Sequence, residues 1–306
     1  MKKILISLAF LSICSLSLAQ TETQDSVPPS KWKLYWKFSG TVGLKVSQTQ
    51  LVNWAAGGNS NFTGIAYANL TLNYKKNKLA WDTKLDTDLG AIYSTDFHSF
   101  KFRKANDKIN FSTMFGYAIS PDKHVNSKWF VAANGSFKSQ YMYGYEYPTD
   151  STRNKLSGWV SPSYTELSVG VNWKWKELFS IYCSPVAGLI TSCTEPALRH
   201  SYGVPEDKTA MASVGLSLGA TVTYDAVKNL KILSGVKLYT PYNDPDQKFG
   251  NFNVDWDVII TYQFLKVLNV SLTTNLKYYH KVLFPESPKR RVQFQEIFGL
   301  GVAYSF

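Results

Sequence analysis

Apolar and polar residues alternate along most of the chain from Trp36 onward, in segments of ten or more residues that Gly, Asn, Asp and Pro clusters separate. In residues 81–93, for example, Trp81 and Leu89 fall on one face and Asp82 and Asp88 on the other. A period of two is typical of β-strands with one apolar and one polar face. These segments predict about twelve strands, near 36–48, 61–76, 79–95, 107–120, 127–146, 160–175, 177–193, 209–225, 229–241, 250–264, 267–283 and 290–306.

The connections between the predicted strands alternate in length. Short turns are expected at 76–78, 174–177, 225–229 and 265–266, and long polar connections near 49–61, 96–106, 147–159, 194–208, 242–249 and 284–289. This asymmetry is typical of outer-membrane barrels, and an even strand number leaves both chain ends on the short-turn side. The sequence therefore predicts an all-β fold, a transmembrane antiparallel up-and-down β-barrel of about 12 strands.

A soluble β-sandwich also alternates apolar and polar residues. Its strands average about five or six residues, whereas these segments exceed the roughly nine to eleven residues that cross a bilayer. Aromatic residues also gather at segment ends, where interfacial girdles lie. Both features favour the barrel, and the girdle candidates are Tyr141, Tyr143, Tyr145, Trp173 and Trp175.

The composition fits this fold in an unexpected way. The chain holds 9 Trp, 19 Tyr and 18 Phe among 306 residues, yet its mean hydropathy is −0.18. No segment after the N-terminus approaches the roughly 18 to 20 consecutive apolar residues of a membrane helix. A barrel explains both facts, because the apolar lipid-facing residues and the polar lumen-facing residues alternate, so their hydropathies cancel in the average over any window.

The N-terminus has the features of a secretory signal peptide. Lys2 and Lys3 precede an apolar run at 4–14 and a small-x-small site that ends at Ala19. A membrane anchor is disfavoured by the short run, and a lipoprotein signal by the residue before Cys14. We expect a signal peptide at 1–19, a flexible periplasmic lead-in at 20–31, and an outer-membrane barrel at 32–306 in a Gram-negative cell.

The C-terminal residues resemble the β-signal by which barrel-assembly machinery recognises outer-membrane barrels. The matching residues are Gly301, Tyr304 and Phe306, in register with an alternating last strand. The resemblance implies contact with that machinery during insertion.

The segment Gln50-Leu-Val-Asn-Trp-Ala-Ala-Gly-Gly-Asn-Ser60 resembles the hallmark of an uncharacterised family of outer-membrane barrels, a domain-of-unknown-function family. The Trp-rich third strand and Lys104-Ala-Asn-Asp-Lys108 also resemble its pattern, which implies a match over the whole mature chain and no transferable activity. Two interpretations of the segment stay open, a lid folded onto the barrel mouth and a contact for a partner or ligand. Its motif residues are Asn53, Trp54, Gly57, Gly58 and Ser60.

Alternation also places charged residues of both signs inside the barrel. Charges so placed form either a structural plug or a polar constriction that selects solutes. Glu296 is an exception, because alternation puts it on the lipid face. The predicted lumen residues are Asp82, Lys84, Asp86, Asp88, Lys138, Glu166, Lys231, Lys237, Asp255, Asp257, Lys277 and Arg291.

The sequence offers little support for chemistry. A barrel lipase needs a His and Ser two apart followed by Asn-Gly, which is missing. His98 beside Asp96 is the nearest protease candidate, and the four His show no metal-ligand spacing. We therefore expect no enzyme, no cofactor and no metal site.

The chain is basic, with 33 Lys+Arg against 22 Asp+Glu. Removing Lys2 and Lys3 with the signal leaves +9 of the net +11, because residues 1–19 hold no acid. Basic loop residues would meet outer-membrane lipid, with its anionic lipopolysaccharide, or simply the solvent. They form no aromatic-flanked patch, which disfavours nucleic acid.

Three functions are compatible with these features. The first is a narrow channel or uptake barrel for small polar solutes. The second is a structural or interaction barrel that docks protein partners through its loops, and the third, which we consider remote, is an outer-membrane hydrolase.

Overall fold

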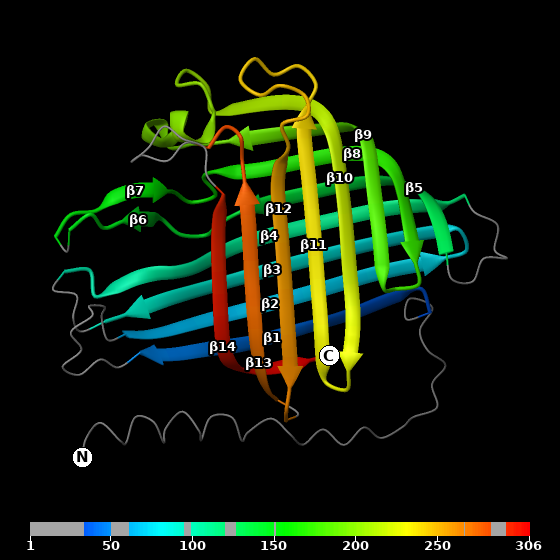
Figure 1. Ribbon diagram of the computed structural model, residues 1–306, viewed down its shortest axis with the longest axis horizontal. Helices are drawn as coiled ribbons and strands as arrows, with labels where there is room; N and C mark the ends of the chain where they lie inside the picture. Colours follow the sequence, from blue (N-terminus) through cyan, green and yellow to red (C-terminus); the bar gives the residue numbers. More distant parts are fainter. Residues whose placement is uncertain are drawn as a thin grey trace. The chain divides into compact units, whose positions relative to one another are not determined.

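The structure is a computed structural model that describes residues 34–49, 61–94, 99–119, 127–149, 151–265, 267–282 and 292–306. Twelve strands close into an antiparallel barrel in the order β1-β14-β13-β12-β11-β10-β9-β8-β5-β4-β3-β2 (Figure 1). The predicted fold class is confirmed. The barrel strands are β1 (Trp36–Thr49), β2 (Asn61–Lys76), β3 (Leu79–Tyr93), β4 (Phe102–Ala118), β5 (Ser127–Ser139), β8 (Ser163–Trp175), β9 (Phe179–Ser192), β10 (Ala210–Val227), β11 (Leu230–Pro241), β12 (Asn253–Gln263), β13 (Leu268–Tyr278) and β14 (Gln293–Ser305).

Every second residue of each strand points away from the interior, and the residues in these outward positions are mostly apolar. The outer surface of the barrel is therefore apolar. On β14 these residues are Phe294, Phe298, Leu300, Val302 and Tyr304, all exposed. Glu296 is exposed on the same side, as predicted for this exception. Within the described ranges, no helix is long and apolar enough to cross a membrane.

Aromatic side chains cluster at the ends of the strands near the short turns. Trp36 lies 5.8 Å from Trp81, and Trp129 lies 6.3 Å from Trp173, between ring centroids. Trp173 donates to Ser127 Oγ at 2.7 Å. Such a belt suits the interface between lipid and water, where an amphipathic ring meets both phases.

One predicted strand is wrong in its second half. The segment expected as a single strand at 127–146 ends at Ser139, and the expected loop at 147–159 contains a second strand. Here β6 (Gly144–Glu146) and β7 (Asn154–Ser157) form a separate two-stranded sheet beyond the barrel. Tyr141, Tyr143 and Tyr145 therefore lie past the end of β5.

Three of the short turns contain a residue with a positive φ angle. Asn77 (φ 52°), Lys176 (φ 53°) and Asn229 (φ 70°) lie in the turns β2–β3, β8–β9 and β10–β11. Tight hairpin turns of two or three residues need a residue with this left-handed backbone, and Asn tolerates it better than most residues. We call this end of the barrel the short-turn end, and the opposite end the long-loop end.

The seam between the first and last strands is short. β1 pairs with β14 only from Thr41–Ser305 to Val46–Leu300, whereas β2 and β3 pair along their whole lengths. Gly40 and Phe306 extend the seam with two backbone hydrogen bonds of 2.9 and 3.0 Å. In Figure 1, β14 diverges from β1 beyond this pairing and continues beside β13.

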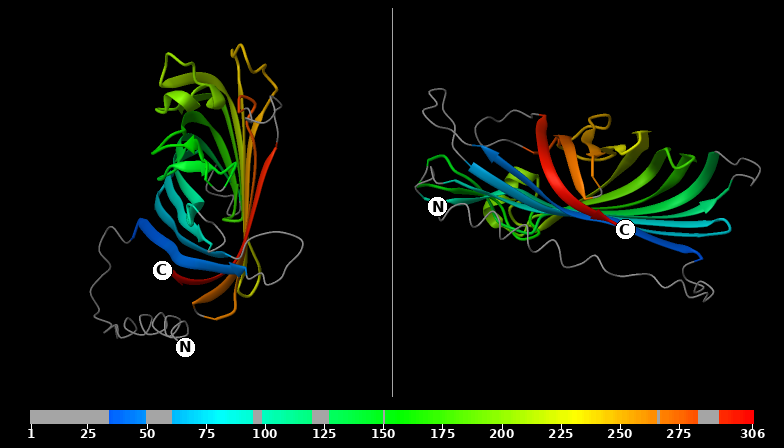
Figure 2. Two further views of the ribbon diagram at one scale, coloured as in Figure 1. Left: turned by 90° about the vertical axis from the view of Figure 1, so that its left-hand side faces the viewer. Right: turned by 90° about the horizontal axis from the view of Figure 1, so that it is seen from below.

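The strands of opposite walls cross one another. Figures 1 and 2 show β1 to β4 running across β10 to β14. Barrel closure requires strands tilted against the barrel axis, which produces this crossing. Side chains from strands far apart in the barrel order can thereby meet across the interior.

Candidate functional site

The interior of the barrel is polar. Hydroxyl and amide side chains occupy the inward positions, while neighbours such as Val169, Val171 and Ile181 are exposed outside. Tyr182 donates to Ser168 Oγ at 3.1 Å across the β8–β9 pair. The buried polar and charged residues of β8, β9, β10 and β13 are Ser163, Glu166, Ser168, Asn172, Ser184, Ser217, Asn269, Ser271 and Thr273.

An ion pair joins opposite walls at the long-loop end. Lys138 near the end of β5 binds Asp255 near the start of β12, with β8 to β11 lying between these strands. Tyr279 also donates to Asp255 Oδ2, at 3.0 Å. Since β5 and β12 face each other, this contact crosses the lumen.

A second ion pair lies in the same region. Lys237 on β11 lies 3.0 Å from Glu166 on β8, with β9 and β10 between the strands. Ser217 donates to the same Glu166 oxygen at 3.0 Å, and Lys237 donates to Ser136 Oγ at 2.9 Å. Side chains from four strands thus form one connected polar constriction.

The short-turn end holds a simpler contact. Lys174 on β8 binds Asp82 on β3, with β4 and β5 between the strands. Both side chains retain 29% of their exposure. Between the two ends, Lys108 on β4 lies 3.6 Å from Asp88 on β3.

The structure brings most predicted lumen charges together. The charge of Asp86 on β3 interacts with that of Asp257 on β12, and Lys277 interacts with Asp255 and Asp257. Lys84 and Lys231 are exposed, and no ion pair of either is found among the residues that the structure describes. Arg291 lies outside the described residues.

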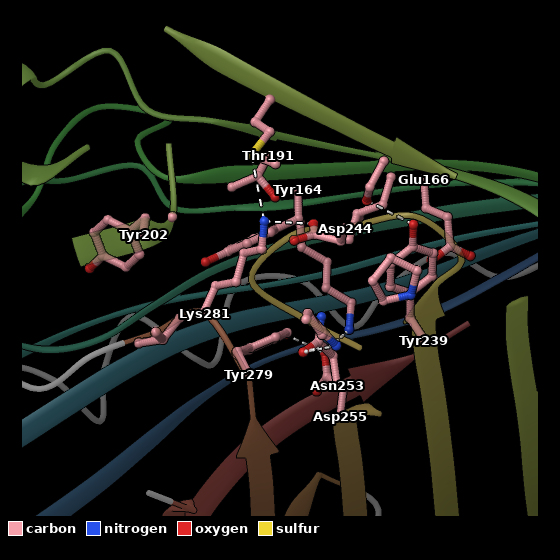
Figure 3. A pocket seen from close by; sticks show the side chains of 18 of the residues that line it. Tyr164, Glu166, Thr191, Tyr202, Tyr239, Asp244, Asn253, Asp255, Tyr279 and Lys281 are labelled. Atoms are coloured by element: carbon pink, nitrogen blue, oxygen red, sulfur yellow. Dashed lines mark hydrogen bonds and ion pairs between the residues drawn. The ribbon is translucent and has the colours of Figure 1, made fainter. Parts of the chain in front are cut away.

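A cavity of about 90 Å³ opens at the long-loop end, beside the two ion pairs (Figure 3). Its lining comes from the ends of β5, β8, β9, β10, β11 and β12 and from the residues after β13. A single water molecule needs roughly 10 to 15 Å³ of such cavity volume. The cavity therefore has room for several waters or a small solute.

The loops around the cavity are tied to one another. Lys281, after β13, lies 2.6 Å from Asp244 in the β11–β12 loop. Tyr202 in the short 3-10 helix η2 (His200–Tyr202) donates to Leu156 O at 2.8 Å. Burial raises the pKa of Tyr202 to about 12 and also raises the pKa of Tyr279, so both phenols stay neutral near pH 7.

The β5–β8 loop is fixed to the barrel by Asp107 of β4. Its carboxylate is fully buried and accepts the backbone N–H groups of Tyr141 and Met142, both at 2.7 Å. Lys104 bonds the same carboxylate at 3.1 Å and Met142 O at 3.1 Å. These contacts, which we call the loop clamp, hold the chain at the point where it leaves the barrel sheet after β5. Lys104 and Asp107 both belong to the segment 104–108 that resembles the family pattern.

The C-terminal residues form the seam. Tyr304 and Phe306 are exposed on the outer face, with ring centroids 5.9 Å apart. Gly301 pairs with Lys45, and a Cβ there would lie 2.8 Å from Leu44 O, so the close approach of β1 requires glycine. The motif residues Asn53, Trp54, Gly57, Gly58 and Ser60 lie outside the described residues.

The catalytic and metal-site candidates of the sequence lie partly outside the residues that the structure describes. Asp96 and His98 lie outside the described residues, and His200 is exposed in η2. In the described part of the chain, no group of three or more His, Cys, Asp or Glu residues could hold a metal ion.

The sequence did not single out the residues that line the cavity besides Lys138, Glu166, Lys237 and Asp255. Tyr164 and Tyr239 share the inward parity of Glu166 and Lys237, so alternation could have found them. Tyr279 and Lys281 share the parity of Lys277 in the predicted strand 267–283, so alternation could have found them as well. No local signal marked Tyr202 or Asp244, because they lie in connections.

A closed antiparallel barrel with an apolar outer face, aromatic residues at the strand ends and a polar interior defines the class of transmembrane β-barrels. A family model described as a protein of unknown function, DUF3078, matches residues 46–145. The match is narrower than the whole mature chain expected from the motifs, and it includes Asp107. Among curated proteins, no sequence matches this chain.

Several solved outer-membrane proteins are similar at low identity. The COG4313 outer membrane channel from Pseudomonas putida F1 is 11% identical with a TM-score of 0.38, covering 94% of this chain and 98% of that one. The translocator domain of autotransporter NalP from Neisseria meningitidis is 9% identical with a TM-score of 0.33, covering 98% and 95%. The NanC porin is 8% identical with a TM-score of 0.36, covering 87% and 97%. These scores add nothing to what the strand order shows about the fold.

Proposed function

We infer that the protein is an outer-membrane channel that admits small polar solutes through a constriction at its long-loop end. The observation that carries this proposal is the makeup of the lumen. Its walls are polar, and the barrel is narrowed by contacts between side chains, Lys138–Asp255 and Lys237–Glu166. Charged side chains that meet across a pore select solutes and can separate by rotamer changes.

The proposal also assigns an orientation. With an even number of strands, the start of β1 and the end of β14 both lie at the short-turn end, which we place in the periplasm. The long-loop end and its cavity then face the outside, where basic loop residues meet lipopolysaccharide. The exposed Tyr304 and Phe306 support recognition by barrel-assembly machinery during insertion.

Single-channel recording of the refolded protein in planar bilayers tests the proposal. We expect small, ion-selective current steps, because solutes must pass a charged constriction. Absence of current over many verified insertions would overturn the channel function.

A second candidate function is docking of a protein partner, which one feature favours. Beyond the barrel, Arg153 stacks on Phe100 and Tyr145, with its guanidinium carbon 4.9 and 4.4 Å from the ring centroids. Arg103 stacks on Tyr147 at 4.3 Å. Arg and Tyr are enriched in protein interfaces. A stoichiometric partner recovered with the wild type but lost with Tyr145→Ala/Arg153→Ala would support docking, and no such partner would count against it.

A further inference from the structure

The cavity at the long-loop end combines charged and aromatic walls. Tyr164 and Tyr279 lie parallel, with ring centroids 5.5 Å apart and planes 4° from parallel. Tyr239 shares a 2.8 Å hydrogen bond with Ser213 Oγ. Figure 3 shows these rings around the same space as Glu166, Asp244, Asp255 and Lys281.

The charges of the cavity are balanced and already paired. Three ammonium groups pair with three carboxylates. A solute with a net charge would therefore find no unpaired protein charge of opposite sign. Burying an unpaired charge is unfavourable. A zwitterion would have to break existing pairs to form its own. The three pairs are Lys138–Asp255, Lys237–Glu166 and Lys281–Asp244.

These paired groups still have hydrogen-bonding capacity. Asp255 Oδ2 accepts from Lys138 and Tyr279, but the other oxygen, Asp255 Oδ1, is buried and has no hydrogen-bond partner among the residues described. A lysine ammonium has three donors, and Lys138 makes one hydrogen bond within the described part of the chain. Hydroxyl groups both donate and accept, so they can bond to a carboxylate and an ammonium without separating the pair.

Aromatic faces beside spaced polar groups suit a ring that carries C–H groups on its faces and hydroxyls on its rim. We propose that the cavity binds a small neutral polyhydroxylated solute, of monosaccharide size. This assignment rests on the proposed channel function, because it identifies the solute class that would enter the constriction.

Binding to the refolded mature chain in detergent micelles tests the assignment. The neutral probes are D-glucose, D-galactose and D-mannose, and the charged probes of matched size are D-glucuronate and D-glucosamine. We expect at least one neutral sugar to bind about tenfold or more tightly than both charged sugars, by titration calorimetry or saturation-transfer NMR. Binding of no neutral sugar, or equal or tighter binding of a charged one, would overturn the proposal.

Variants then locate the bound sugar. Asp255→Asn removes one carboxylate, so we expect about tenfold weaker binding of the neutral sugar and a relative gain for glucuronate. Asp82→Asn is the same change in an ion pair that does not line the cavity, so it should leave the binding of the neutral sugar and of glucuronate unchanged. If Asp255→Asn does not fold, Asp244→Asn replaces it, because Asp244 lies in a loop. Unchanged sugar selectivity in the folded variant would contradict the site.

The two proposals can fail separately. Sugar binding without current would remove the channel function and keep the site. Current without sugar binding or sugar-dependent blockade would keep the channel and remove the site.

Discussion

Lysine–carboxylate pairs cross the lumen at both ends, but their surroundings differ. At the long-loop end, Glu166 and Asp255 keep 3% and 8% of their side-chain exposure and receive additional hydrogen bonds from Ser217 and Tyr279. At the short-turn end, the Asp82 carboxylate keeps 29%. The lysines of the three pairs are alike, with 23% for Lys138, 28% for Lys237 and 29% for Lys174, so the two ends differ in the burial of their carboxylates. The same pairing thus belongs to a braced network at one end and to a solvated contact at the other.

This difference between the two ends is why we assign the constriction to the long-loop end. Buried and multiply bonded charges lose much free energy when one partner is removed, whereas solvated pairs contribute little. We therefore expect substitutions at the long-loop end to change both stability and conduction, and matched substitutions at the short-turn end to change neither strongly.

The largest effect is expected from Glu166→Gln. The variant leaves the Lys237 ammonium in the lumen without its carboxylate, so the free energy of unfolding should fall by about 3 kcal/mol. Denaturant titration of the detergent-refolded barrel measures it. Adding Lys237→Met should recover most of the loss, and equal stability of the single and double variants would contradict the network.

The next effect concerns the loop clamp. Asp107→Ala removes the acceptor of two backbone N–H groups and of Lys104, so the β5–β8 loop should lose about 2 kcal/mol of local stability. Hydrogen exchange at Tyr141 and Met142 should accelerate roughly thirtyfold, while barrel unfolding changes less. Asp225→Ala, at the exposed short-turn end, is the control. Unchanged exchange would show that the clamp does not hold the loop.

Alkaline pH should loosen the cover of the cavity by a smaller amount. The pKa of Tyr202 is about 12 in the folded state and about 10 when unfolded, so stability is full below pH 10 and falls as pH rises toward 12. Loss of the phenol proton removes the hydrogen bond to Leu156. The protection of residues 155–157 against hydrogen exchange, relative to the base-catalysed exchange of an unstructured chain at the same pH, should therefore fall between pH 10 and 12 in the wild type and change less with pH in Tyr202→Phe. The same pH dependence in both proteins would contradict this role.

The smallest effect is expected from Asp82→Asn. The pair with Lys174 is solvated, so the free energy of unfolding should change by less than about 1 kcal/mol. A loss comparable to that of Glu166→Gln, measured under identical conditions, would remove the distinction between the two ends.

Much of the barrel could be predicted from the sequence, because alternation reports directly which face of a strand is buried. The bounds of β2 match the prediction, and those of β1, β3 and β11 differ by one or two residues. The hairpin β6–β7 could not be predicted, because Gly144–Glu146 continues the alternation of β5. The backbone N–H groups that follow β5 bond instead to Asp107, which is distant in the sequence.

The candidate site was predictable only in part. Alternation identified Asp82, Lys237 and Asp255 as inward, but it says nothing of the strand that each one faces. Lys174 looked like a turn residue, and its contact with Asp82 depends on the crossing of the walls. The cavity also requires loop residues such as Asp244, whose positions follow from tertiary contacts.

The most direct test of the central claim compares two matched double variants in planar bilayers. Glu166→Gln/Lys237→Met removes the buried pair at the long-loop end, and Asp82→Asn/Lys174→Met removes the solvated pair at the short-turn end. We predict small current steps in the wild type, clearly larger or longer openings in the first variant, and wild-type behaviour in the second. No current from any of the three proteins, or equal gains from both variants, would contradict a channel constricted at its long-loop end.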